Sequence, residues 1–172
     1  MTLSKIRTMS GELDTPHTPH APHAWLAAAR DPQIAGELEL LYEHIGREVA
    51  RHQPRCTQSG RCCNFDAWGH RLYVTGLEAA YLFSRLEQQL TADDITRSLA
   101  RGGCPFQRSL LCAVHAIRPL GCRVYYCDQS GLGWQEALTE RTLAEVCALH
   151  DRHDIPYHYG EWRTTLEMLV NA

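Results

Sequence analysis

Seven of the chain's eight cysteines fall into two clusters. The first occupies the loop CTQSGRCC at residues 56–63, and the second lies within CPFQRSLLCAVHAIRPLGCRVYYC at residues 104–127. Thiolates are soft donors that suit zinc and iron–sulfur clusters, whereas magnesium and calcium prefer oxygen ligands. The pattern therefore predicts a site for a soft metal. Its candidate ligands are Cys56, Cys62, Cys63, Cys104, Cys112, Cys122 and Cys127.

These thiols exceed the needs of one metal site. Four thiolates complete a tetrahedral zinc site or hold a four-iron cluster. Adjacent residues rarely bind one ion together, so Cys62 and Cys63 either serve two sites or contribute a single ligand. The surplus indicates either a second site that the protein coordinates only in part or cysteines that merely pack. The choice between zinc and an iron–sulfur cluster also stays open at this point.

Three other side chains of the second cluster have chemistry relevant to a metal. His115 is a candidate ligand, because imidazole commonly binds zinc. Arg118 and Arg123 are expected to donate hydrogen bonds to thiolates or carbonyls and to offset part of the thiolate charge. Ordinary surface ion pairing is the alternative for both arginines. Cys147 lies outside both clusters on a helical face, so we expect it to pack as a small hydrophobic residue.

The order of the motifs around the cysteines resembles a known family. The motifs are Gly60-Arg61-Cys62-Cys63, Cys104-Pro105-Phe106, Cys112, Arg118-Pro119, Cys122-Arg123 and Cys127. In this order they resemble the YkgJ-type cysteine-cluster family, described as zinc- or iron-chelating domains. The chain departs from the family at Ser59, where members often carry another cysteine, and at His115, where they often carry an aromatic residue. The resemblance implies metal binding through the cysteines.

Catalysis is an alternative function for such a centre. Flagellin lysine methylases resemble the family around the cysteines, which implies an iron–sulfur-dependent redox or protein-modifying enzyme as the alternative. The sequence contains no fingerprint for a nucleotide or S-adenosylmethionine and no Ser-His-Asp signature. A third interpretation is a metal-storage or interaction module, in which His17, His20 and His23 deliver ions to the cysteines.

The composition is that of an ordinary globular protein. A chain of 172 residues, 44% hydrophobic and 22% charged, predicts one domain with a hydrophobic core. A net charge of −3 argues against a nucleic-acid partner. No apolar run reaches the roughly 18 residues of a membrane span, and the N-terminus lacks a signal-peptide core. We therefore expect a cytoplasmic protein with no membrane partner, whose reduced thiols serve a metal rather than disulfides.

The chain divides into a tail and one domain. Residues 1–23 mix Ser, Thr, Pro, Gly and His with few large apolar side chains, which predicts a disordered tail. Residues 24–172 are expected to form a single cysteine-cluster metal-binding domain. Its fold class is predicted as mainly α with short β pieces, a small helical domain around a cysteine-rich core.

Local signals predict the elements that position the cysteines. Asp31-Pro32 starts a helix that runs to about residue 51 and leads to Cys56. Residues 71–74 are a short strand candidate, followed by capping-box pairs at Thr75/Glu78 and Thr91/Asp94 that open two further helices. The second of these helices ends at Gly102-Gly103 and presents Cys104. Short β pieces are predicted at residues 110–114 and 124–126, and helices at residues 134–153, with a break near Thr139, and at residues 161–170.

Overall fold

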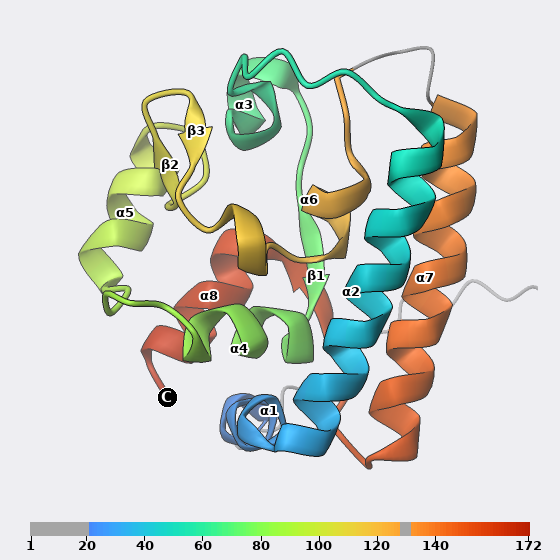
Figure 1. The fold of residues 1–172 in the computed structure, drawn as a ribbon. Coiled ribbons are helices and arrows are strands. Elements are labelled where there is room, and N and C mark those ends of the chain that lie inside the picture. Colours follow the sequence, from blue (N-terminus) through green and yellow to red (C-terminus); the bar gives the residue numbers. More distant parts are fainter. Residues whose placement is uncertain (1–20, 128–131) are drawn as a thin grey trace, which may run out of the picture.

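The computed structural model describes residues 21–127 and 132–172. This part of the chain is mainly α-helical with two small antiparallel sheets, which confirms the predicted fold class (Figure 1). The helices are α1 (Ala21–Arg30), α2 (Pro32–His52), α3 (Phe65–Trp68), α4 (Gly76–Ser84), α5 (Ala92–Ala100), α6 (Leu120–Val124), α7 (Leu132–Arg152) and α8 (Trp162–Val170). The strands are β1 (Tyr73–Thr75), β2 (Gln107–Arg108), β3 (Leu111–Cys112) and β4 (Tyr159–Glu161).

Helix α2 begins where the sequence predicts it. The Asp31 carboxylate accepts hydrogen bonds from the backbone N–H groups of Gln33 and Ile34, so it caps the first turn. The helix packs beside α7, and the two long helices form one side of the molecule (Figure 1). Helix α7 runs without interruption from Leu132 to Arg152, so the predicted break near Thr139 is wrong.

Helix α1 was not predicted. It places Trp25 fully inside the core, and the indole N–H of Trp25 donates to the carbonyl of Pro156 at 2.7 Å. Residues 21–23 of the predicted tail belong to this helix, so the predicted boundary at residue 24 is wrong. The rest of the predicted tail, residues 1–20, lies outside the described residues, as do His17 and His20.

Both predicted capping boxes are present. Thr75 opens α4 together with Glu78, and Thr91 opens α5 together with Asp94. Strand β1 pairs antiparallel with β4, so Tyr73 lies opposite Glu161 and Thr75 opposite Tyr159. The pair joins the start of α4 to the start of α8, which carries Trp162 into the core.

The predicted β pieces are confirmed in one place and wrong in another. Strands β2 and β3 form a short hairpin, and β3 lies inside the predicted piece at residues 110–114. Residues 124–126 are not a strand, because Val124 is the last residue of α6. Within the described ranges, no helix is both long and apolar enough to cross a membrane.

Candidate metal centre

The first cysteine loop is fixed against the β2–β3 hairpin. Gly60 has a positive φ of 71°, and a Cβ at this position would lie 2.7 Å from the side-chain nitrogen of Gln107. That same nitrogen donates to the carbonyl of Gly60 at 3.2 Å. Glycine is therefore required here, since only it allows both the left-handed backbone and the close approach. The 3₁₀ turn that follows carries Cys62 and Cys63.

A backbone hydrogen bond joins the two cysteine clusters. The N–H of Cys104 donates to the carbonyl of Cys63 at 2.8 Å. One residue earlier, a Cβ on Gly103 would lie 2.9 Å from the same carbonyl, so the two segments approach too closely for a side chain at this position. A second bond, from the N–H of Asp66 to the carbonyl of Gly102 at 2.9 Å, extends the contact. Segments about forty residues apart along the chain thus lie in direct contact.

Five thiols meet at this junction. The thiol of Cys63 is hydrogen-bonded to those of Cys62, Cys104 and Cys112. The Cys122 thiol, on α6, lies close enough to Cys62, Cys104 and Cys112 for their negative charge to raise its pKa, in addition to the larger effect of burial. We call these five residues the thiol cluster. Cys63 and Cys104 are buried, Cys112 and Cys122 are half-buried, and Cys62 is exposed.

The contacts within the thiol cluster lower the pKa of some of its thiols and raise the pKa of others. The hydrogen bond with Cys63 lowers the pKa of Cys62 to about 6 and that of Cys112 to about 7. The hydrogen bond between Cys63 and Cys104 is likewise the main cause of the lowered pKa of Cys104. Cys63 itself has a raised pKa, because it is hydrogen-bonded to three thiolate-forming neighbours, and burial raises the pKa of Cys122. Several of the thiols can therefore become thiolates near neutral pH, as metal ligation requires.

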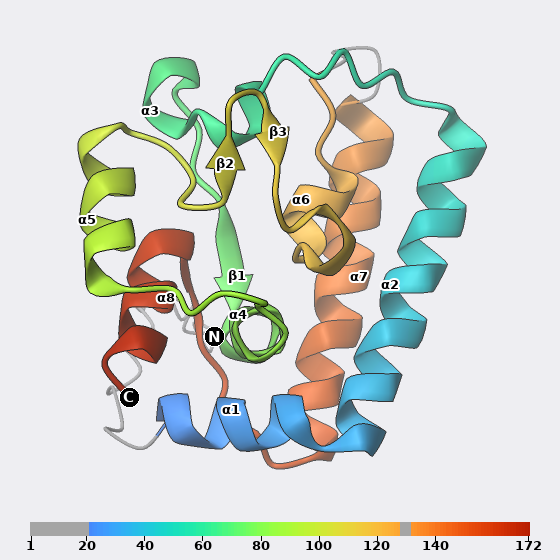
Figure 2. The ribbon, with the colours of Figure 1, turned by 60° about the vertical axis from the view of Figure 1, so that its left-hand side comes forward.

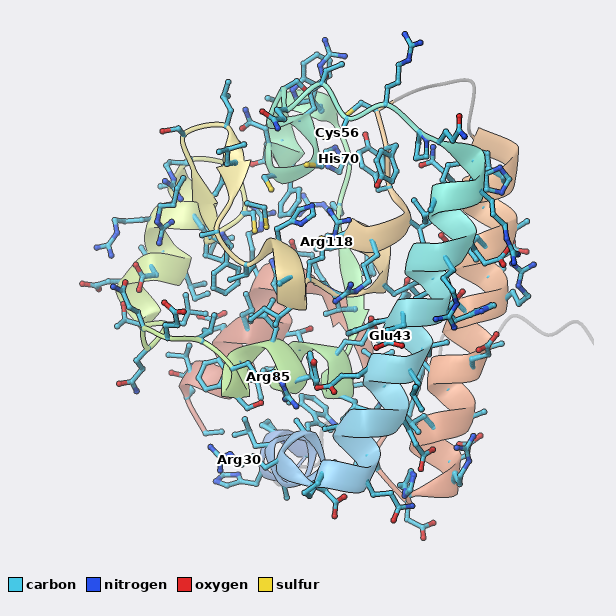
Figure 3. The ribbon with its side chains drawn as sticks, viewed as in Figure 1. Arg30, Glu43, Cys56, His70, Arg85 and Arg118 are labelled. Atoms are coloured by element: carbon cyan, nitrogen blue, oxygen red, sulfur yellow. The ribbon has the colours of Figure 1, made fainter. Side chains whose placement is uncertain are left out.

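The remaining predicted ligands line a cavity next to the thiol cluster. The cavity has a volume of about 410 Å³, and Cys56 and Cys127 line it together with four residues of the thiol cluster. Cys104 does not line the cavity itself but is hydrogen-bonded to Cys63, which does. In Figure 3, Cys56 and Arg118, which also lines the cavity, both lie in the upper half of the molecule. The structure thus brings all seven predicted cysteines to one place.

The thiols contact one another rather than a common point. Across residues 21–127 and 132–172, no group of three or more His, Cys, Asp or Glu side chains has the geometry of a metal site as the side chains stand. The chemistry of the donors nevertheless fits a soft cation, because lowered thiol pKa values and partial burial favour thiolates over oxygen ligands. A metal that binds these sulfurs displaces the protons that they now share.

Comparison with known families decides the classification. Residues 55–148, more than half of the chain, match the family CxxCxxCC, described as "Putative zinc- or iron-chelating domain". The chain belongs to this family. The match confirms the resemblance to YkgJ-type cysteine-cluster proteins and is consistent with zinc or an iron–sulfur cluster. Neither the curated proteins nor the solved structures contain a match to the chain.

Within this CxxCxxCC domain, His115 and the two predicted arginines take different roles. Arg118 donates from Nη1 to Nε2 of His115 at 2.6 Å, so that imidazole nitrogen is already engaged. Desolvation, aided by the nearby arginines, lowers the pKa of His115. The charge of Arg118 helps to lower the pKa of Cys62 and Cys112, while Arg123 donates to the carbonyl of Ala116 at 2.9 Å.

Two residues near the CxxCxxCC cysteines were missed at the sequence level. Within the part of the chain that the structure describes, the indole N–H of Trp162 is buried without a nitrogen or oxygen partner. Its interaction with the Cys104 thiol helps to lower the pKa of Cys104, after the larger effect of Cys63. His70 stacks on Tyr125 with centroids 5.4 Å apart and places Nε2 3.4 Å from the carbonyl of Cys62. Trp162 lies on α8, outside the matched range, where its sequence indicates only a core position.

Cys147 is separate from the thiol cluster. It lies on α7, where its thiol is hydrogen-bonded to Tyr157. His150 is buried nearby and places Nδ1 3.3 Å from the carbonyl of Ile155. Neither residue lines the cavity of the cysteine centre, so both are suitable reference positions for experiments.

Proposed function

We propose that the protein is a cytoplasmic metal-binding protein whose thiol cluster, with Cys56 and Cys127 beside it, holds zinc or an iron–sulfur cluster. The observation that carries the proposal is the Cys63 thiol, which is hydrogen-bonded to three other thiols from both cysteine-rich segments. All eight cysteines are free, which suits a reducing compartment. In this proposal a single domain begins with α1 at Ala21, three residues before the predicted boundary, and runs to residue 172.

The residues around the centre would prepare it for a cation. When bound, the metal supplies the positive charge that holds several thiolates together. Cys62, Cys104 and Cys112 give up their protons most readily, because their thiol pKa values are lowered. Arg118 offsets part of the resulting negative charge from the side of the cavity. The interaction of Trp162 with Cys104 would help to stabilise the buried Cys104 thiolate.

Anaerobic purification followed by elemental analysis and visible spectroscopy tests this function. Colourless protein with stoichiometric zinc would assign a zinc site, and iron with acid-labile sulfide and a visible chromophore would assign an iron–sulfur cluster. Well-folded protein that holds neither metal after anaerobic preparation would contradict the proposal.

A second candidate function is an iron–sulfur-dependent redox or protein-modifying enzyme. The observation that favours it is access to the thiol cluster from two sides. Besides the cavity already described, a second cavity of about 400 Å³ is lined by Cys62 and Cys122 together with His70 and Tyr125. A reactant in either cavity would lie beside the sulfurs. Reversible bleaching of the chromophore by dithionite would support this candidate, whereas stoichiometric zinc would exclude it.

A further inference from the structure

A third cavity is lined by two arginines. It has a volume of about 340 Å³ and lies between the C-terminal end of α2 and the segment around α6. Arg118, Arg123, Gln53 and Tyr126 supply its polar lining. Among the described residues, no Asp or Glu lines it. We call it the arginine pocket.

Neither arginine has a carboxylate partner in the described part of the chain. Arg123 donates from Nη2 to the carbonyl of Ala116 and lies over the ring of Tyr42 at 3.9 Å. Arg118 contacts His115 through Nη1. In both side chains Nε is covered by the protein and has no partner among the described residues, so a ligand in the pocket would meet the Nη groups that make no such contact.

The carboxylate of Glu78, whose charge affects the pKa of Arg123, is already hydrogen-bonded to other groups. Glu78 is buried and accepts hydrogen bonds from the N–H of Leu120 at 2.7 Å and from the backbone and hydroxyl of Thr75. Tyr42 also donates to it, at 3.3 Å. These donors occupy both carboxylate oxygens of Glu78, and no hydrogen bond or ion pair joins it to Arg123 in the described part of the chain. The guanidinium of Arg123 therefore keeps donor capacity.

Gln53 also lines the arginine pocket. It ends α2 in the left-handed conformation that often closes a helix, with its N–H donating to the carbonyl of Ala50.

We propose that the arginine pocket binds the carboxylate or phosphate group of a small anionic ligand. The planar guanidinium presents paired N–H donors that match the oxygens of both groups. Arg118 lines both this pocket and the cavity of the thiol cluster, so a ligand held here lies next to the cysteines. The inference goes beyond metal binding and does not depend on it.

Titration of the wild-type protein tests the site directly. The Nε–H resonances of Arg118 and Arg123 are followed by ¹H–¹⁵N NMR while inorganic phosphate or acetate replaces chloride at constant ionic strength. We expect both resonances to shift and to saturate, and the anion with the lower Kd identifies the phosphate or the carboxylate class. Shifts that do not saturate with either anion would overturn the proposal.

Matched variants separate the pocket from general electrostatics. Arg123→Gln should weaken binding by about tenfold or more, since a hydrogen bond to a charged group is lost. Arg123→Lys, which keeps the charge without the paired donors, should lie between, and it carries the test if Arg123→Gln does not fold. Arg47→Gln is the control, because Arg47 is an exposed residue of α2 that pairs with Glu43. Equal weakening by the control, or unchanged binding in both folded Arg123 variants, would overturn the proposal. Metal content is measured on every sample, so its loss is distinguished from loss of anion binding.

Discussion

Cys63 is the residue at which the two cysteine clusters meet. Its carbonyl accepts the N–H of Cys104, and its thiol is hydrogen-bonded to three other thiols. Its position also requires glycine at residue 103, where any side chain would reach its carbonyl. One residue therefore combines the backbone contact that brings the segments together with the sulfur contacts that make a candidate metal site.

Replacing Cys63 should remove most of the metal affinity. Serine keeps the size of the side chain but offers an oxygen, a poorer ligand than a thiolate for a soft metal. We expect Cys63→Ser to bind metal at least about tenfold more weakly, a loss of about 1.4 kcal/mol of binding free energy. Competition with a chromophoric chelator measures the affinity. Cys147→Ser is the matched control and should bind as the wild type, because Cys147 lies away from the cluster. Equal affinities for the two variants would contradict a role for Cys63.

Cys62 should be the fastest-reacting thiol once metal is removed by a chelator. It is exposed, and the hydrogen bond with Cys63 lowers its pKa to about 6. Below this pH the thiol is protonated and slow, so its alkylation rate should rise through about pH 6 and level off above. Pulsed iodoacetamide labelling with peptide mapping gives the profile. In Arg118→Gln, which loses a charge that lowers this pKa, the profile should move to higher pH. A midpoint that stays near that of an ordinary thiol would count against the hydrogen-bonded cluster.

At the scale of elements, the sequence predicts what local chemistry decides. Asp31, Thr75 and Thr91 each satisfy backbone N–H groups within three residues, so the starts of α2, α4 and α5 follow from the sequence. Helix α6 does not, because its five residues contain the β-compatible Val124 and its first N–H is bound by distant Glu78. Helix α1 was not predicted either, and its Trp25 is fully buried in the core through contacts with distant parts of the chain.

The candidate site was likewise predictable only in part. The number and spacing of the cysteines predict that seven thiols gather in one region of the molecule. Which thiols touch depends on tertiary contacts such as the bond between Cys104 and Cys63. The contact of Trp162 with Cys104 depends on the pairing of β1 with β4, which no local signal specifies.

Glu78 should control the position of α6 and of Cys122. It accepts from the N–H of Leu120 at 2.7 Å while closing the capping box of Thr75. Glu78→Ala leaves these buried donors unsatisfied, so the free energy of unfolding should fall by about 1–3 kcal/mol, and metal affinity should fall as Cys122 loses its anchor. Urea unfolding in the presence of chelator measures the first effect, and chelator competition the second. Glu78→Gln keeps one oxygen acceptor and should lose less. If Glu78→Ala lowers stability but leaves metal affinity unchanged, the position of Cys122 does not depend on this anchor.

At the scale of the whole molecule, the helical core and the cysteine end are distinct. The core is centred on fully buried side chains of α1, α2, α4 and α8, namely Trp25, Leu38, Ile45, Leu77 and Leu166. In Figure 2, α3 and the β2–β3 hairpin lie at the end of the molecule away from α1. The cysteines belong mainly to loops, a short hairpin and short helical turns at that end. Such segments bury fewer apolar contacts and open more easily than long packed helices.

Metal removal should therefore loosen one end of the molecule and leave the helical core folded. After chelation we expect amide hydrogen exchange to accelerate in residues 53–72 and 103–127, which contain the seven clustered cysteines. Residues 32–52 and 162–170 should stay protected. Far-UV circular dichroism should retain most of its helical signal. Added metal should raise the free energy of unfolding with its concentration, by about 2.7 kcal/mol at a hundredfold excess over Kd. The exchange data are compared with those of Cys63→Ser, which should resemble the chelated protein without chelator. Uniform loss of protection through α2 and α8 would contradict this prediction. It would show that the helical core, which includes Trp25 and Leu38, is not stable without the metal.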